Sequence, residues 1–143
     1  LHKAIRRQRQ MCIRDREKDI EKKFVDGIKK IGGRAYKFVS PGNAGVPDRI
    51  VVLPGGRVIF VELKTETGRL TGRQKIQIRT LSRLGCEVWK LYGEDHVEAF
   101  LAEMAGRLFT DGLAEGLGTE GGDRREIYPA QLSKEGCLFY PGA

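Results

Sequence analysis

The chain has 143 residues, of which 40% are hydrophobic and 31% are charged, and its formal net charge is +7. This composition is typical of one globular domain and excludes an intrinsically disordered or fibrous chain. Its apolar runs fall short of the roughly 18 residues that a membrane-spanning helix needs. The first residues lack the apolar stretch of a secretory signal. The three cysteines are scattered (Cys12, Cys86 and Cys137), which excludes a disulfide scaffold or a CxxC zinc site and favours a reducing, cytoplasmic setting.

The positive charge is concentrated at the beginning of the chain. Residues 1–16 hold six basic residues and one acidic residue, so they contribute +5 and leave +2 for the remaining chain. Within them, Met11-Cys12-Ile13-Arg14-Asp15-Arg16 resembles the translation of a common sequencing-library adapter. We therefore interpret residues 1–16 either as a basic arm that binds phosphate or as a non-native leader, and we base no function on the overall charge.

The first half of the chain predicts a helix, a strand and a hairpin. Apolar residues recur every three or four positions over residues 19–31, which predicts an amphipathic helix that ends at a pair of glycines. Residues 34–40 are rich in aromatic and β-branched side chains and predict a strand, and a turn-rich loop follows. Two apolar runs, residues 48–53 and 57–64, flank Pro54-Gly55-Gly56 and predict a β-hairpin. Both faces of these runs are apolar, so we expect a sheet covered on both sides.

The second half alternates helix and strand. Residues 71–84 and 95–104 predict helices, and Asp95 with Glu98 forms a candidate capping pair for the later one. Residues 86–92 lie between them and predict a fourth strand. The resulting order, α-β-β-β-α-β-α, is typical of an α/β fold with a mixed central sheet flanked by helices. Residues 107–143 are glycine-rich and slightly acidic, so we expect a loosely ordered tail behind a domain of residues 17–106.

The hairpin places two carboxylates opposite each other. If Pro54-Gly55-Gly56 is a three-residue loop with Gly56 in the left-handed conformation, Leu53 pairs with Arg57. That register places Asp48 opposite Glu62, with their Cβ atoms about 5 Å apart. A two-residue loop would turn Asp48 to the other face of the sheet.

Such a pair of like charges needs a compensating partner. Asp48 and Glu62 destabilise a strand pair unless a cation lies between them, and Mg²⁺ is a hard ion that takes oxygen ligands. Lys64 is two residues beyond Glu62 and therefore shares its face. A lysine there can orient or deprotonate a water molecule, or stabilise the charge that grows during phosphodiester cleavage. The alternative interpretation is a ladder of ion pairs on the protein surface, which would contribute little to stability.

These residues resemble a known nuclease family. Asp48 followed by Glu62-Leu63-Lys64 on an αβββαβ framework resembles the PD-(D/E)xK nuclease superfamily. The more specific resemblance is to its VRR-NUC branch, which occurs in phage and bacterial replication and repair proteins. It rests on Gly45-Val46-Pro47-Asp48-Arg49-Ile50, Phe60-Val61-Glu62-Leu63-Lys64, Gly68-Arg69-Leu70 and Gln74. It covers about residues 17–104.

The resemblance implies a restriction-endonuclease-like fold and a Mg²⁺- or Mn²⁺-dependent endonuclease that hydrolyses phosphodiester bonds in DNA. The substrate implied is a Holliday junction or other branched DNA, cut by a homodimer during DNA repair in a bacterial or phage-infected cytoplasm. By the same resemblance, the metal ligands would be Asp48, Glu62, the Leu63 carbonyl and a glutamate of the first helix. Lys64 would activate the attacking water, and Gln74 would project toward the site.

Several assignments have competing interpretations. The helix carboxylate is Glu17 or Glu21, and Glu17 is favoured because it lies at the centre of the apolar stripe while Glu21 lies about 40° away. Gln74 fits equally well a capping box with Thr71. The whole domain could instead be a catalytically silent module that binds branched DNA, or an interaction subunit of a repair or replication complex. Candidate nucleic-acid contacts are Arg69, Arg73, Lys37 and Ser40.

Overall fold

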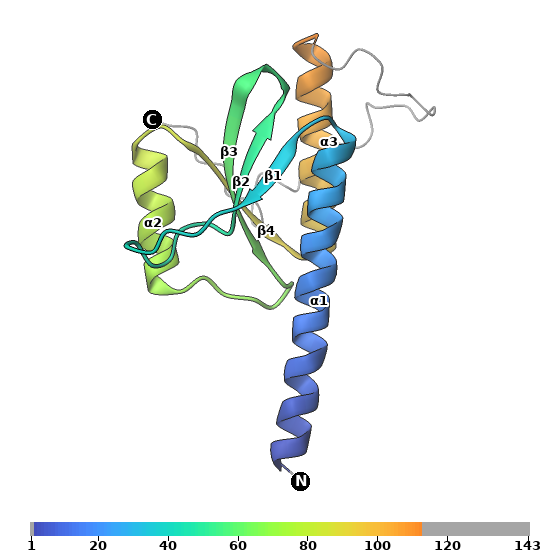
Figure 1. Ribbon diagram of the computed structural model, residues 1–143, viewed down its shortest axis with the longest axis vertical. Helices are drawn as coiled ribbons and strands as arrows, with labels where there is room; N and C mark the ends of the chain where they lie inside the picture. Colours follow the sequence, from blue (N-terminus) through green and yellow to red (C-terminus); the bar gives the residue numbers. More distant parts are fainter. Residues whose placement is uncertain (1, 113–143) are drawn as a thin grey trace.

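The computed structural model describes residues 2–112 (Figure 1). Expectations for most of the tail, from residue 113 onward, lie outside these residues. No helix among residues 2–112 combines the length and apolar character needed to cross a membrane. The elements in chain order are α1 (His2–Lys30), β1 (Arg34–Lys37), β2 (Arg49–Leu53), a 3₁₀ turn η1 (Pro54–Gly56), β3 (Arg57–Lys64), α2 (Gly72–Arg83), β4 (Glu87–Tyr92) and α3 (Gly93–Thr110).

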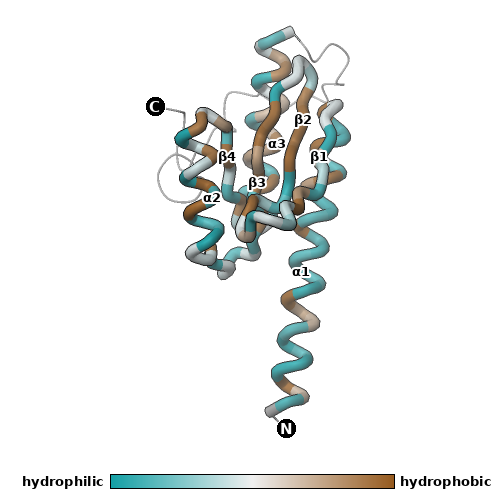
Figure 2. The backbone as a smooth tube through the Cα atoms, turned by 60° about the vertical axis from the view of Figure 1, so that its left-hand side comes forward, coloured by the Kyte–Doolittle hydropathy of each residue, from teal (hydrophilic) through white to brown (hydrophobic). Residues whose placement is uncertain are grey.

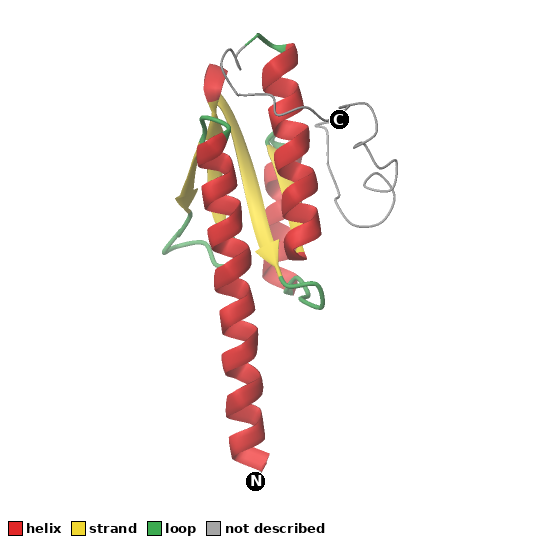
Figure 3. Ribbon diagram, turned by 90° about the vertical axis from the view of Figure 1, so that its right-hand side faces the viewer, coloured by secondary structure: helices red, strands yellow, loops and turns green. Residues whose placement is uncertain are grey.

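The four strands form one mixed sheet in the order β1-β2-β3-β4. The first three strands are antiparallel, and β4 runs parallel to β3 after the α2 crossover. Helices α1 and α3 lie side by side against one face of the sheet, and α2 lies on the other face (Figures 1 and 3). This arrangement confirms the predicted α/β fold with a mixed sheet between helices.

The core lies between the sheet and the α1–α3 pair. Phe24, Ile28 and Phe100 from the two helices are almost completely buried against alternate residues of the strands. The hydrophobic strands contrast with the largely hydrophilic N-terminal half of α1 (Figure 2). Alternate residues of each strand point to the same face of the sheet. The predicted apolar stripe of α1 therefore forms one side of the core, and the inward-facing strand residues form the other.

The expectation that both faces of the sheet are covered is wrong for part of the α2 side. The face toward α1 and α3 is buried, whereas on the α2 side Val58 keeps 47% and Tyr36 keeps 50% of its surface exposed. Helix α2 packs over β4 and leaves the outer strands partly open. The apolar residues on both faces of the strands correctly indicate that both faces are apolar. They do not indicate how much of one face a single helix covers.

Helix α1 is longer than the apolar pattern predicts. It begins at His2 instead of residue 19, and residues 3–19 are exposed. Ile20 is its first buried residue. The pattern marks only the part of the helix that packs on the sheet, because an exposed helix carries no requirement for apolar periodicity. The helix runs through residue 16 without a break.

Helix α3 begins earlier and ends later than predicted, and the proposed capping pair is wrong. The helix extends through Thr110 and buries Leu108 in the core, so the expectation of a loosely ordered tail is wrong for residues 107–110. The helix starts at Gly93, and its N-cap residue Tyr92 makes no side-chain cap. The backbone N–H of Tyr92 instead donates to Nδ1 of His96 at 3.0 Å. Asp95 and Glu98 therefore lie inside the helix and do not cap it.

Candidate active site

The hairpin has the predicted register. The three-residue loop pairs Leu53 with Arg57, and Gly55 and Gly56 both have positive φ angles of 83° and 80°. The ladder continues to Arg49 opposite Val61, so the next position along the hairpin brings Asp48 to Glu62. A local rule for hairpin loops is therefore sufficient to bring the two acidic residues to one end of the sheet.

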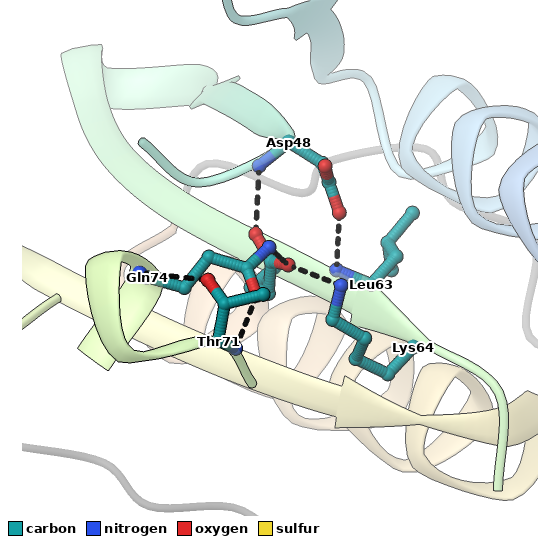
Figure 4. Close-up of polar contacts among 6 residues, drawn as sticks. Asp48, Leu63, Lys64, Thr71 and Gln74 are labelled. Atoms are coloured by element: carbon teal, nitrogen blue, oxygen red, sulfur yellow. Dashed lines mark hydrogen bonds and ion pairs between the residues drawn. The ribbon is translucent and has the colours of Figure 1, made fainter. Parts of the chain in front are cut away.

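Two hydrogen bonds tie Asp48 to the end of β3 (Figure 4). The backbone N–H of Asp48 donates to Glu62 Oε2 at 3.2 Å, and the backbone N–H of Leu63 donates to Asp48 Oδ2 at 3.1 Å. Asp48, directly before β2, and the end of β3 thus each donate a backbone N–H to the other's carboxylate. These bonds hold both carboxylates within the same small region without a direct contact between them.

Glu62 is buried and surrounded by hydrogen-bond donors. Its side chain is fully buried, and its Oε1 accepts from Lys64 Nζ at 2.8 Å and from Gln74 Nε2. Together with the N–H of Asp48, three donors face one carboxylate. This is the environment in which a buried acidic group is tolerated, because each oxygen has a partner.

Burial raises the pKa of Glu62 to about 7, from an ordinary value of 4.5. The hydrogen bond from Lys64 opposes this increase, and the negative charge of Asp48 adds to it. Burial lowers the pKa of Lys64, but the hydrogen bond to Glu62 and the charges of Asp48 and Glu17 outweigh burial, so its pKa is raised. Lys64 is therefore an ammonium ion at neutral pH, and a cation bound near Glu62 would favour its carboxylate form.

Gln74 serves both of the roles considered for it. Its Oε1 accepts from the N–H of Thr71 at 2.9 Å, and its own N–H donates to Thr71 Oγ1 at 3.2 Å, which completes a capping box. Its Nε2 remains available and donates to Glu62. Because Thr71 takes up the amide oxygen, the amide nitrogen is the part of Gln74 that faces the carboxylate (Figure 4).

Gly45 brings the loop before Asp48 against the first turn of α2. Its φ angle is +89°, and a Cβ built there would lie 2.6 Å from the carbonyl carbon of Arg73 and 2.8 Å from the backbone nitrogen of Gln74. Only glycine permits this approach, both sterically and conformationally. The contact fixes the spacing between the segment that carries Asp48 and the helix that carries Gln74.

A cavity of about 310 Å³ opens between α1 and this end of the hairpin. Asp48 and Lys64 reach it from the sheet, and α1 supplies acidic and basic side chains on its other wall. The full lining consists of Arg14, Glu17, Lys18, Ile20, Glu21, Asp48, Leu63 and Lys64.

The two candidate glutamates of α1 have different partners. Glu21 forms an ion pair with Arg49, whose side chain is only 12% exposed. Glu17 is exposed, and its charge contributes to the raised pKa of Lys64. Both glutamates line the cavity, but only Glu21 is engaged by a neighbouring strand.

The donor atoms fit a hard divalent cation. Asp48 and Glu62 offer carboxylate oxygens, and the carbonyl of Leu63 is adjacent in sequence to Glu62. Within residues 2–112 no three histidine, cysteine or acidic side chains are gathered tightly enough to form a ready-made metal cage. Two carboxylates with one carbonyl suit Mg²⁺, which usually retains several water molecules, better than an ion that needs a complete protein cage.

The four predicted nucleic-acid contacts lie outside the cavity lining. Arg69, Arg73 and Lys37 are exposed, Arg73 in the first turn of α2 and Lys37 at the end of β1. Ser40 is half-buried, and its Oγ accepts from Asn43 Nδ2 at 3.1 Å. These residues therefore lie outside the cavity, and three of them are exposed at the surface.

Three residues with roles around the site were not identified from the sequence. Arg49 fixes Glu21, and Arg14 and Lys18 line the cavity. The sequence shows that Arg49 directly follows Asp48. Its partner could not be predicted, because the contact with Glu21 depends on how α1 packs across the sheet. The basic residues of α1 have no apolar pattern around them that would mark the cavity.

Comparison with known proteins identifies the family of the chain. The sequence model of the VRR-NUC domain family matches residues 7–95. A protein named "Putative nuclease p44", from Acyrthosiphon pisum secondary endosymbiont phage 1, is 50% identical over 80 residues, which cover 56% of this chain and 86% of that protein. A solved VRR-NUC domain structure has a TM-score of 0.52 at 24% identity, covering 66% of this chain and 95% of the other, and supports the fold. The chain therefore belongs to the VRR-NUC domain family and contains a nuclease domain.

Proposed function

We propose that the protein is a Mg²⁺- or Mn²⁺-dependent endonuclease that hydrolyses phosphodiester bonds in DNA. The observation that carries this proposal is the meeting of Asp48, Glu62 and Lys64 at one end of the hairpin, beside an open cavity. A surface ladder of ion pairs would not bury Glu62 completely. Strongly perturbed ionisable groups beside a cavity are typical of catalytic sites.

The residues of the chain have distinct parts in this reaction. Asp48, Glu62 and the Leu63 carbonyl would hold the cation, with Glu17 reaching it directly or through water. The bound cation would lower the pKa of water and neutralise charge on the phosphate. Lys64, as an ammonium ion, activates the attacking water by orienting it through a donated hydrogen bond, and it stabilises the negative charge that develops on the phosphate oxygens. Gln74 holds the Glu62 carboxylate in place.

The preferred substrate and assembly rest on the family resemblance. We infer that branched DNA, such as a Holliday junction, is cut by a homodimer, because two copies of one site can cleave two strands symmetrically. The similarity to a phage protein supports a setting in the cytoplasm of a bacterial or phage-infected cell. Recognition would rely on phosphate contacts, which carry no base-sequence information, and on the branched form of the DNA.

A cleavage panel tests the function. Labelled four-way junctions, flaps, nicked duplexes and linear duplexes are incubated with the full chain in Mg²⁺, Mn²⁺ or EDTA. We expect cleavage with either metal, no cleavage in EDTA, and a preference for branched DNA. Asp48→Asn should abolish cleavage while binding persists. Binding by the unmutated chain without cleavage under any condition would instead identify a silent DNA-binding module.

A further inference from the structure

A row of basic side chains runs along α1 beside the candidate active site. Arg14, Lys18 and Lys22 follow each other at intervals of four residues, so they project within an arc of about 80°. All three are exposed, and none forms an ion pair within residues 2–112. The neighbouring Lys23, by contrast, is held by acidic residues of α3. The row therefore presents three cations to solvent.

The row begins inside the cavity and continues away from it. Arg14 and Lys18 line the same cavity as Asp48 and Lys64, whereas Lys22 follows one turn further along the helix, outside the lining. Two acidic residues of α1, Glu17 and Glu21, line the same cavity beside the first two members of the row. Because α1 is one continuous helix, these side chains have fixed positions relative to the cleavage site.

The spacing of the row matches a nucleic-acid strand. Residues four apart rise about 6 Å along a helix. A DNA strand carries one phosphate for about every 3.4 Å of helix axis, so each step of the row corresponds to about two phosphates. A phosphate entering a cavity with several carboxylates is repelled by them, and flanking cations would offset this repulsion.

We propose that Lys18 and Lys22, extended by Arg14, form a phosphate-binding row that holds DNA along α1 on one side of the cleavage site. This inference rests on the proposed nuclease function and adds the surface by which the substrate strand is held. The row contacts the DNA backbone, so its contribution is independent of base sequence. It differs from Arg69, Arg73, Lys37 and Ser40 in that two of its members, Arg14 and Lys18, line the cavity.

The test measures how salt changes DNA binding. The full chain in EDTA is titrated onto a fluorescein-labelled 30-base-pair duplex, and onto a single strand of the same length, between 50 and 200 mM salt. Lys18→Gln and Lys22→Gln should each weaken binding several-fold and reduce the slope of log K against log salt by about 1, for any base sequence. Lys30→Gln is the matched control, because Lys30 is exposed on the same helix but lies about 120° around it and about 18 Å along it from Lys18, and about 80° around it and about 12 Å along it from Lys22.

The outcomes separate this inference from the nuclease proposal. Equal slopes for Lys18→Gln, Lys30→Gln and the unmutated chain would overturn the binding row, even if the unmutated chain cleaves DNA with Mg²⁺. Salt-independent binding of the unmutated chain would overturn it as well. A reduced slope for Lys18→Gln in a chain that never cleaves would uphold the row and overturn the nuclease proposal. Thermal melts should agree among the variants, because substitutions of exposed side chains usually change stability little.

Discussion

Replacing Glu62 with glutamine should change how the stability of the metal-free protein depends on pH. Burial raises the pKa of Glu62 to about 7 in the folded protein, from 4.5 for the ordinary group. The folded state therefore holds this proton more tightly than the unfolded state. The stabilisation is complete below pH 4.5 and is lost as the pH rises through about 7. The difference between the two pKa values corresponds to about 3 kcal/mol.

Glu62→Gln removes the titration and keeps the size of the side chain. Relative to the variant, the unmutated protein should lose about 3 kcal/mol of unfolding free energy between pH 4.5 and pH 8, or about 10 °C in Tm. Urea unfolding in EDTA, at half-unit pH steps, measures this difference, and titrating groups remote from Glu62 cancel because both proteins contain them. Parallel pH curves for the two proteins would refute the assignment of a destabilised carboxylate to Glu62.

Three further substitutions test the surroundings of Glu62. Gly45→Ala should lower the free energy of unfolding in urea by about 2–4 kcal/mol, because a Cβ at positive φ meets the first turn of α2. Gly42→Ala should be neutral, because a Cβ there meets nothing within 4 Å. Equal losses of stability in the two variants would contradict the spacing role of Gly45. Gln74→Leu should cost about 1–2 kcal/mol through loss of the hydrogen bond from Thr71 N–H and of the donor to Glu62, and should slow single-turnover cleavage. An unchanged cleavage rate would show that Gln74 only caps the helix. Lys64→Met should slow single-turnover cleavage about 100-fold or more with DNA binding retained, and equal losses of binding and cleavage would contradict a role in the transition state.

The arrangement at the end of the hairpin could be predicted because its causes are local. A three-residue loop with glycines at positive φ sets the register, and the register fixes which residues share a face. The spacing of Thr71 and Gln74 likewise predicts a capping box. The second contact of Gln74, with Glu62, needed the α2 crossover to place the helix over the strands.

The features that escaped prediction depend on packing or on its absence. The exposed half of α1 has no buried face, so nothing in its pattern marks where the helix begins. Glu21 and Arg49 are 28 residues apart and meet only because α1 crosses the sheet at that point. His96 accepts a backbone hydrogen bond at the start of α3, a role that a single histidine does not reveal in a sequence.

Binding of Mn²⁺ to the metal-free protein tests most directly whether Asp48 and Glu62 share a divalent cation. Free Mn²⁺ is measured by electron paramagnetic resonance while the unmutated chain, Asp48→Asn, Glu62→Gln and the distant control Lys30→Gln are each titrated. We expect saturable binding to the unmutated chain and to Lys30→Gln, and its loss in both carboxylate variants. Equal Mn²⁺ binding by all four proteins would show that the two carboxylates do not form the metal site.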